Sequence, residues 1–424
     1  MRPSAGLLAH AESALRELLR FAGPADQVLS HYFRAHAELG QRERAFVAEA
    51  AFAVLRRRRS LEAAAGSAVP RALLIAALTR VLGFSGRSLD GLAEAALIER
   101  IRASRAEALA DAVRADLPDW LWQALESEHG RDDAMRIAQG LLDPAPLDLR
   151  VNLARISREA VLARLAADGI AAEAARYAPS GVRLAGKPAI NQHALFRDGL
   201  VEVQDEGSQL LAYLLAPRRG EMLADYCAGA GGKTLAIAML MRGEGRIYAM
   251  DVSAKRLAAL AKRAARAQVS NVHSLALASD NDARAKRLRG KLDRALVDAP
   301  CSGFGTLRRN PDLKWRHGPQ AIPELVEKQR RILAAAARLV KPGGRLVYAT
   351  CSVLRAENEA IADHFLAGSP DFVALSCADL LAAQRIPLDT GERLRLWSHR
   401  HGTDGFFAAA FERRGASPER DKNT

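Results

Sequence analysis

Apolar and polar residues alternate along this chain with two different periods, and the change of period divides the chain. From residue 1 to about 140 the apolar residues recur at helical spacing, so that Val47, Ala51 and Val54 fall on one helix face. The stretch "LLDPAPLDLRVN", with its two prolines, ends this pattern. We therefore predict an all-helical domain over residues 1–140.

A short mixed region, residues 141–215, follows. The stretches "LDLRVNL" and "GLVEVQDEGSQ" are strand-like, and between them "SREAVLARLAADG" predicts a helix that begins near Ser157 and ends at Gly169. This pattern predicts a small α/β (RRM-like) linker subdomain.

After Gly220, apolar runs alternate with helical segments. The predicted strands are "EMLADYC", "GRIYAMD", "LDRALVDAP", "RLVYATCS", "DFVALS" and "GFFAAAFER"; helices separate several of them, and "KPGG" is a predicted turn. Continuous apolar strands are typical of a parallel sheet covered by helices on both faces. We predict a Rossmann-like, doubly wound, mostly parallel α/β domain over residues 216–413, and a disordered tail over residues 414–424.

Composition narrows the class of protein. Of 424 residues, 49% are hydrophobic and 26% charged, which indicates a folded globular protein, and no run approaches the roughly 18 apolar residues of a membrane span. Four widely spaced cysteines exclude a disulfide framework and a zinc motif, so we expect a cytoplasmic protein with no metal. A net charge of +13 favours a polyanionic partner such as nucleic acid; the alternative is an arginine-rich composition without that function.

The stretch "DYCAGAGGKT", Asp225 to Thr234, follows the first strand of the large sheet and is a candidate ligand loop. A triphosphate-binding loop requires glycine where Cys227 stands, and a dinucleotide motif fails at Thr234. What remains is a glycine-rich turn with an acid, Asp251, about twenty residues later, placed for ribose hydroxyls. This combination favours S-adenosylmethionine, although Asp251 taken alone would be better explained as a helix N-cap.

Asp280, in "LASDNDA", follows the next apolar segment and is a candidate acceptor for an adenine amino group. Asp282 lies close enough to be the alternative.

Two cysteines end neighbouring predicted strands, Cys301 in "LVDAPC" and Cys351 in "LVYATCS". C5 of cytosine becomes nucleophilic only after a thiolate adds to C6, and a nearby acid that protonates or hydrogen-bonds N3 assists that addition. One cysteine that attacks, one acid and a second group for elimination fit this chemistry. We interpret Cys377 as an ordinary small apolar residue, and the same interpretation is the simplest for Cys227.

In order along the chain, "DYCAGAGGKT", "MDVSAKR", "LVDAPCSGFGTLRRNPDLKW", "YATCSVLRAENE" and "GTDGFF" resemble the motifs of the Nol/Nop/Sun family of RNA cytosine-5 methyltransferases. The resemblance is strongest to its bacterial Sun-like (RsmB-like) branch, which methylates ribosomal RNA. The stretch "LGQRERAFVAEAAFAVLRR" is similar to the NusB-like helical RNA-binding domain of that branch.

This resemblance implies that Cys351 is the nucleophile, that Cys301 assists product release, and that Asp298 contacts the base, the cofactor or both. It also implies an S-adenosylmethionine pocket lined by Cys227, Ala228, Gly229, Ala230, Gly231, Gly232, Lys233, Asp251, Asp280 and Asp298. The family usually has Ala-Pro where this chain has Gly229-Ala230, so we expect a more flexible loop here.

Candidate RNA contacts are Arg308, Arg309, Lys314 and Trp315, together with the "RRRR" run at residues 56–59. The alternatives are a Trp packed on the sheet beside a surface Lys, and a solvated helix end. We expect a monomer that acts on ribosomal RNA or an assembling small ribosomal subunit. The other hypotheses are methylation of tRNA or DNA cytosine, and a non-catalytic ribosome-assembly factor.

Overall fold

The structure, a computed structural model, describes residues 3–280 and 282–415. The chain forms two compact units: Met1–Pro144 with Thr306–Ala321, and Ala145–Gly305 with Ile322–Thr424. The first unit is all-helical, as predicted, but it also takes in residues 306–321, which lie within the predicted Rossmann-like domain. The second unit contains both predicted α/β parts. Most of the predicted tail, from residue 416 on, lies outside the described residues.

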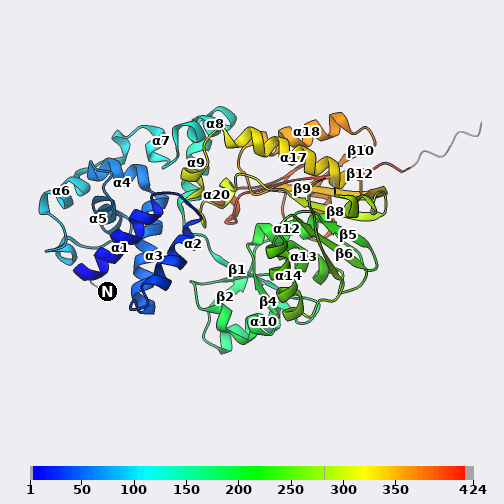
Figure 1. Ribbon diagram of the computed structural model, residues 1–424, viewed down its shortest axis with the longest axis horizontal. Coiled ribbons are helices and arrows are strands. Elements are labelled where there is room, and N and C mark those ends of the chain that lie inside the picture. The colour runs from blue at the N-terminus through cyan, green and yellow to red at the C-terminus, as the bar shows by residue number, and fades with distance from the viewer. Residues whose placement is uncertain (1–2, 281, 416–424) are drawn as a thin grey trace, which may run out of the picture. The chain divides into compact units, whose positions relative to one another are not determined.

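In the helical unit, buried side chains between Leu7 and Ile101 form one apolar core. Figure 1 shows the helices of this unit. Its helices are α1 (Ala5–Leu18), α2 (Ala25–Ala35), α3 (Gln41–Arg56), α4 (Arg58–Ala65), α5 (Pro70–Arg80), α6 (Ala95–Ala103), α7 (Asp111–Arg114), α8 (Asp119–His129), α9 (Arg131–Leu142) and α16 (Leu313–Arg316), with 3₁₀ turns η1 (Gly86–Leu89) and η2 (Ala106–Ala108). Helix α1 begins at the N-cap Ser4, whose hydroxyl accepts from Leu7 N at 3.1 Å. Helix α5 begins with Pro70 and buries residues on all sides, which places it at the centre of this core.

No single helix in the described ranges is long and apolar enough to cross a membrane. Helices α4 and α5 reach the required length and composition only as a pair, and they are bent by 101° at their junction.

The small α/β part of the second unit is a four-stranded antiparallel sheet in the order β2-β3-β1-β4. Its elements are β1 (Leu147–Val151), α10 (Arg158–Ala167), β2 (Ala172–Ala174), β3 (Gly181–Leu184), η3 (Ile190–Gln192), α11 (Ala194–Arg197) and β4 (Val201–Val203). The predicted strand "GLVEVQDEGSQ" is partly wrong. Only β4 is extended, and Asp205, whose carboxylate accepts from Gly207 N at 2.8 Å, caps a buried helix, α12 (Glu206–Leu215).

The large sheet has the order β10-β12-β9-β8-β5-β6-β7, with β11 paired to β12. Its strands are β5 (Met222–Asp225), β6 (Arg246–Asp251), β7 (Val272–Ala276), β8 (Leu292–Asp298), β9 (Val340–Thr350), β10 (Phe372–Leu375), β11 (Leu394–Leu396) and β12 (Phe406–Arg413). The five strands from β9 to β7 are parallel, whereas β10, β11 and β12 pair antiparallel. The predicted Rossmann-like, mostly parallel sheet is therefore confirmed.

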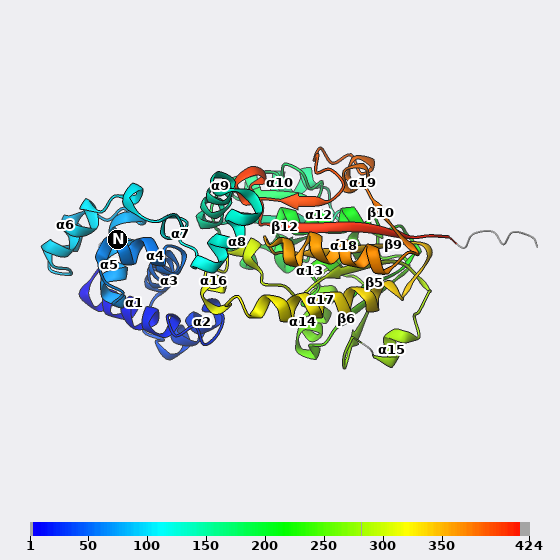
Figure 2. The ribbon, with the colours of Figure 1, turned by 90° about the horizontal axis from the view of Figure 1, so that it is seen from above.

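Helices cover both faces of this sheet (Figures 1 and 2). Besides α12, the helices of this part are α13 (Gly232–Leu240), α14 (Ala254–Arg266), α15 (Ala283–Lys286), α17 (Ala321–Ala337), α18 (Glu359–Gly368), α19 (Cys377–Ala383) and α20 (Ser398–His401), with turns η4 (Phe304–Thr306) and η5 (Arg355–Glu357). Alternate strand residues enter different cores: Leu223 packs with α12 and α13, whereas the next residue, Ala224, packs in the cluster that includes α17 and α18. This two-sided burial explains the continuous apolar strands.

The predicted turn "KPGG" lies inside β9 instead of before it. The register between β8 and β9 shifts between the pairs Leu292–Val340 and Arg294–Arg345, and Gly343 has φ +74°. A bulge absorbs the extra residues, so the strand continues to Thr350.

Candidate active site: a pocket at the strand ends and two facing cysteines

The loop between β5 and α13 forms one wall of a pocket at the carboxyl ends of the parallel strands. Gly229 and Gly231 both have positive φ, +55° and +86°. A Cβ on Gly231 would lie 2.0 Å from Leu260 Cδ1 on α14, so only glycine lets the loop pack this closely. At its base, Thr234 Oγ1 donates to Asp225 Oδ2 at 2.7 Å.

Asp251, at the end of β6, holds this loop directly. Its Oδ2 accepts from Gly229 N at 2.8 Å and its Oδ1 accepts from Ser253 N at 2.7 Å. The N-cap of α14 is Ser253, not Asp251. The helix-cap alternative for Asp251 is therefore wrong, and its carboxylate, which has further acceptor capacity, faces the pocket.

The two candidate acids after β7 separate clearly. Asp280 lines the pocket, and its carboxylate pairs with Arg331 Nε at 3.0 Å. Asp282 caps α15 and accepts from the backbone N–H groups of Ala278 and Arg284. Hydrogen bonds from the Arg284 side chain and these amides lower the pKa of Asp282. Of the two acids, Asp280 is placed to contact a ligand.

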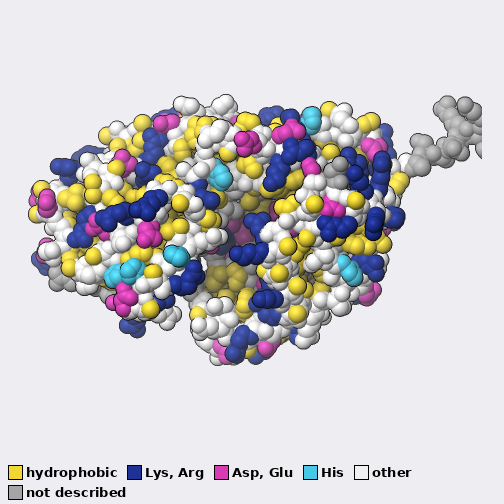
Figure 3. Space-filling view, viewed as in Figure 1, with side chains coloured by type: hydrophobic (Ala, Val, Ile, Leu, Met, Phe, Trp, Pro, Cys, Tyr) yellow, Lys and Arg dark blue, Asp and Glu magenta, His cyan; other side chains and the backbone are white. Residues whose placement is uncertain are grey.

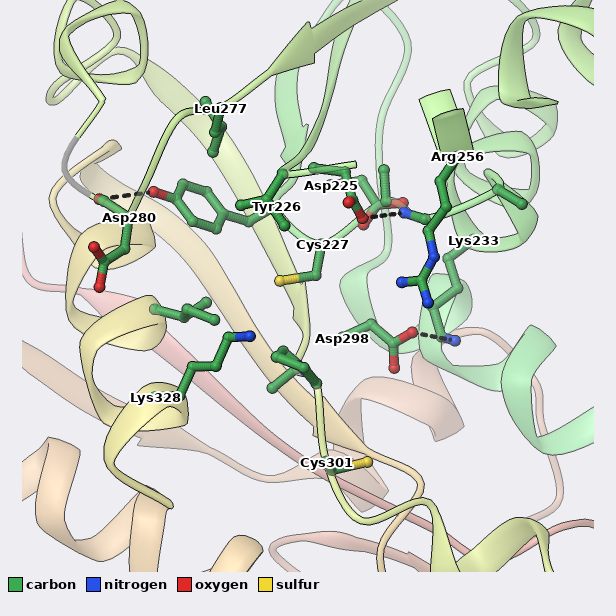
Figure 4. A pocket seen from close by; sticks show the side chains of 18 of the residues that line it. Asp225, Tyr226, Cys227, Lys233, Arg256, Leu277, Asp280, Asp298, Cys301 and Lys328 are labelled. Carbon is green, nitrogen blue, oxygen red and sulfur yellow. Dashed lines mark hydrogen bonds and ion pairs between the residues drawn. The ribbon is translucent and has the colours of Figure 1, made fainter. Parts of the chain in front are cut away.

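The pocket encloses about 640 Å³, a size typical of cofactor sites. Every residue predicted to bind the cofactor lines it, except Gly231, and so do Cys301 and Cys351. Figure 4 shows Asp280 and Tyr226 toward one end and Asp298 and Cys301 toward the other. The pocket residues that the sequence reasoning missed are Asp225, Tyr226, Val252, Arg256, Leu277, Ser279, Ala299, Pro300, Lys328, Arg331 and Ile332.

Some of these were within reach of the sequence. Val252 and Leu277 directly follow strand ends, where parallel sheets gather ligands. Lys328 and Arg331 come from the middle of α17, and nothing in the local sequence indicates that this helix face meets the pocket.

Cys301 and Cys351 face each other across the ends of β8 and β9. These strands are parallel neighbours, with Asp298 opposite Ala349, and the two Sγ atoms lie 3.4 Å apart. The contact with Cys351, together with burial, raises the pKa of Cys301 well above the ordinary thiol value. Cys301 therefore keeps its proton in this arrangement, and either thiol can be the donor in the contact.

Lys233 and Asp298 form an ion pair beside these cysteines, with Nζ 2.7 Å from Oδ2. Burial alone would lower the pKa of Lys233, but Asp298 and Cys351 outweigh it, so this pKa is raised. Lys233 thus remains an ammonium group beside the cysteine pair.

The other two cysteines differ from this pair. Cys377 is fully buried among apolar side chains, and burial raises its pKa to about 11, which makes it unreactive. Cys227 lines the pocket, but burial raises its pKa strongly as well.

The predicted RNA contacts after Cys301 need correction. Lys314 is only 2% exposed, because its Nζ donates to Arg56 O at 2.8 Å inside the helical unit. Trp315 Nε1 donates to Leu55 O at 2.8 Å, so it packs on α3 and not on the sheet. Arg308 is also buried, and Arg309 is half-buried. Neither Lys314 nor Arg308 is available to phosphate in this structure.

The arginine run at 56–59 belongs to the same packing. Arg56 donates to Arg308 O at 3.1 Å, and Arg59 pairs with Asp119 and donates to Leu117 O. The Arg58 guanidinium lies 5.5 Å from the ring centre of Trp315. These contacts make most of the run structural. On the face in Figure 3, other Lys and Arg side chains are spread over both units with acidic side chains between them.

Comparison with known proteins identifies the family. A sequence profile described as "16S rRNA methyltransferase RsmB/F" matches residues 212–412, and one described as "Methyltr_RsmF/B-like, ferredoxin-like domain" matches residues 117–191. The "Ribosomal RNA small subunit methyltransferase B" of Sodalis glossinidius is 37% identical over 307 residues, which cover 71% of this chain and 67% of that protein. The chain belongs to the RsmB/F family of ribosomal RNA methyltransferases.

Two further bacterial relatives support the same family. The "Probable ribosomal RNA small subunit methyltransferase B" of Bacillus subtilis is 36% identical, with 70% of this chain and 66% of that protein covered. Its Synechocystis counterpart is 38% identical, with 69% and 66% covered. The match thus spans about two thirds of each relative.

Solved structures share the fold. The crystal structure of PH0851 superposes with a TM-score of 0.79 at 25% identity, covering 97% of this chain and all of that one. A methyltransferase homologue from Pyrococcus horikoshii gives 0.62 at 30% identity, covering 72% of this chain and 97% of that one. The predicted RsmB-like family membership is confirmed, and the small sheet that we expected to be RRM-like lies partly in the region matched as ferredoxin-like.

Proposed function

We propose that this RsmB/F-family chain transfers a methyl group from S-adenosylmethionine to C5 of a cytosine in small-subunit ribosomal RNA. The observation that carries this proposal is the pair of thiols 3.4 Å apart at the mouth of a cofactor-sized pocket. Cys351 is the nucleophile that adds to C6, and Cys301 assists the release of the product.

The pocket residues fit S-adenosylmethionine. Asp251 offers carboxylate lone pairs to ribose hydroxyls, and Asp280 offers an acceptor to the adenine amino group. Asp225 Oδ1, fully buried, has no hydrogen-bond partner among the described residues, and burial raises the pKa of Asp225 to about 7. Such an acceptor suits a ligand that carries donor groups. The cofactor supplies an electrophilic methyl group when it is bound.

The Lys233–Asp298 pair prepares the attack. The Lys233 ammonium group is held against Asp298, and together they place an acid–base pair at the cysteine end of the pocket. A proton held between Lys233 and Asp298 can pass to, or hydrogen-bond, N3 of the base while the S–C6 bond forms. C5 then carries the electron density that takes the methyl group.

The pKa of Cys301 changes during the reaction. Its pKa is raised mainly by Cys351, through their hydrogen bond, and next by burial. Once Cys351 is bonded to C6, that hydrogen bond and the Cys351 charge are gone, and the pKa of Cys301 falls. Cys301 can then release its own proton to solvent and, as a thiolate, take the proton from C5. The C6–S bond breaks with its electron pair returning to Cys351, and N3 returns its proton to the Lys233–Asp298 pair.

The substrate class rests on the family and on charge. The relatives are named for the small-subunit ribosomal RNA, and the chain carries a net charge of +13, which favours an RNA partner. We propose that the helical unit is the NusB-like RNA-binding part and that the enzyme works in the cytoplasm as a monomer. The target cytosine must leave any helical stack to reach Cys351.

The test is transfer of labelled methyl groups from S-adenosylmethionine to 16S ribosomal RNA, to assembling 30S particles, to tRNA and to DNA, followed by bisulfite sequencing. We expect one protected cytosine in the ribosomal substrate. Transfer to tRNA or DNA alone would overturn the substrate. Absence of S-adenosylmethionine binding by calorimetry would favour the non-catalytic assembly factor.

A further inference from the structure

Glu357, in η5, is a buried acid that touches both cysteine loops and has no place in the mechanism above. Its side chain is fully buried. Oε1 accepts from Ser302 N at 2.8 Å and from Gln329 Nε2 at 2.9 Å, while Oε2 accepts from the hydroxyls of Ser302 and Ser352, each at 2.5 Å. Ser302 follows Cys301, and Ser352 follows Cys351.

None of these four donors carries a charge, so Glu357 is not half of an ion pair with them. A buried carboxylate is costly unless several hydrogen bonds satisfy it, and charge-assisted hydrogen bonds are roughly twice as strong as neutral ones. The two serine hydroxyls lie 3.1 Å apart, and both point their protons at the same carboxylate oxygen. The carboxylate therefore links the Cys301 loop to the Cys351 loop through their two serines.

The ordinary sheet contacts end before the cysteines. The pairing of β8 with β9 runs to Asp298 and Ala349, and one further bond joins Ala299 N to Ala349 O at 2.8 Å. Beyond that point, Gly305 N donates to Cys351 O at 2.8 Å, which joins the far end of the Cys301 loop to the residue after β9. Glu357 adds a tie at Ser302 and Ser352, the residues next to the two cysteines.

A second layer holds Glu357 itself. Gln329, which donates to Glu357, also donates to Pro300 O at 3.0 Å, so it fixes the residue before Cys301. Tyr348 Oη donates to Glu357 O at 2.6 Å, and Asn358 Nδ2 donates to Ser352 O at 3.1 Å. The cluster thus spans both loops, the end of β9 and α17.

We propose that Glu357 is a positioning residue that sets the spacing between the thiols of Cys301 and Cys351. The inference rests on the proposed function, since that spacing matters because both thiols act on one base. Glu357 does not line the cofactor pocket. Substitution of Glu357 should therefore slow the step in which Cys301 assists release of the base from Cys351, and should leave cofactor binding unchanged. A misplacement of about 1 Å can slow a reaction about 10²-fold.

The test compares Glu357→Ala, Ser352→Ala and Glu357→Gln with the control Ser180→Ala. Ser180, next to β3 of the small sheet, is a fully buried serine whose hydroxyl donates to Gln209 Oε1 at 2.9 Å, and it does not line the pocket. It controls for the general cost of losing a buried hydroxyl bond. In Glu357→Gln the amide keeps the shape, and the serine hydroxyls can turn to accept from it.

We expect Glu357→Ala and Ser352→Ala to lower kcat about 10- to 100-fold, with the Kd for S-adenosylmethionine changed less than twofold and covalent protein–RNA adduct accumulating although Cys301 is present. Glu357→Gln recovers most of kcat, and Ser180→Ala keeps it. The proposal would be overturned if Ser352→Ala and Glu357→Ala kept the wild-type kcat. It would also be overturned if their kcat fell only in proportion to a loss of cofactor binding or of folded protein.

A second readout does not depend on methyl transfer. Diamide takes two electrons and two protons from a pair of thiols and leaves a disulfide, so its reaction reports on thiol spacing. We expect the Cys301–Cys351 disulfide, measured by mass spectrometry, to form at least about 10-fold more slowly in Glu357→Ala than in wild type or Ser180→Ala. An unchanged rate would overturn the positioning role. If this rate falls but even the wild-type chain methylates no RNA, the proposed function fails and the positioning role stands.

Discussion

Two halves of one motif, "LVDAPCSGFGTLRRNPDLKW", belong to different units of the molecule. Its first half ends β8 and brings Asp298 and Cys301 to the pocket edge. Its second half, from Thr306, belongs to the helical unit, where Lys314 and Trp315 donate to carbonyls at the end of α3. Residues that follow one another within a single motif thus have separate tasks.

The comparison separates two reasons why a polar side chain can be placed so specifically. At the pocket edge, the acids and thiols come from several strand ends and converge on one space. In the second half of the motif, the buried Lys314 anchors its segment to the helical unit. Burial lowers the pKa of Lys314, and the negative charge of Asp116 offsets part of that lowering. Chemistry at the sheet edge and anchoring in the helical unit should therefore respond differently to substitution.

The largest effect is expected at the pocket edge, from Cys351→Ala. Without its thiolate no bond to C6 forms, so we expect methyl transfer to fall at least about 10³-fold while S-adenosylmethionine still binds. Transfer of labelled methyl groups to 16S ribosomal RNA measures this, with Cys377→Ala as the control for a cysteine buried elsewhere. Retained activity would remove Cys351 from the chemistry.

An intermediate effect distinguishes the two acids after β7. Asp280→Asn should weaken S-adenosylmethionine binding about 10-fold, because a lining acceptor becomes partly a donor. Asp282→Asn should leave that affinity within about twofold, since Asp282 caps α15. Calorimetry on both variants measures the difference. Equal losses would mean that the pocket does not use Asp280 for the adenine end.

The smallest effect on catalysis is expected in the anchoring half, from Lys314→Met. Burial lowers the pKa of Lys314 to about 7, whereas the unfolded chain keeps the ordinary value near 10.5. Between these values the unfolded state binds a proton that the folded state lacks, so stability rises with pH from about 7 to 10.5 and declines as pH falls toward 7. Lys314→Met should flatten this dependence.

Tm measured at pH 7, 8 and 9 tests this, with the exposed Lys187→Met as the matched control. Methyl transfer and RNA affinity of Lys314→Met should stay within about twofold of wild type. If Lys314 instead contacts phosphate, the variant will lose RNA affinity, and the slope of log affinity against log salt concentration will decrease by about one.

The sheet edge was largely predictable from sequence, because strand ends carry a local signal. Apolar runs that stop at Asp225, Asp251 and Asp298 place these acids on one edge. The helix that begins after Asp205 was missed because "QDEGSQ" follows a short strand without a break in polarity. The burial of Lys314 was out of reach, since it depends on α3, about 260 residues earlier in the chain, whose contact with it leaves no local pattern.

The division of labour between the two cysteines is the central claim, and one measurement tests it directly. Cys301→Ala is incubated with S-adenosylmethionine and the ribosomal substrate, and covalent protein–RNA adduct is quantified on a denaturing gel, with Cys301→Ala/Cys351→Ala as the control. We predict that adduct accumulates in the single variant and is absent from the double variant. Normal release of methylated RNA by Cys301→Ala, with no adduct, would contradict the account.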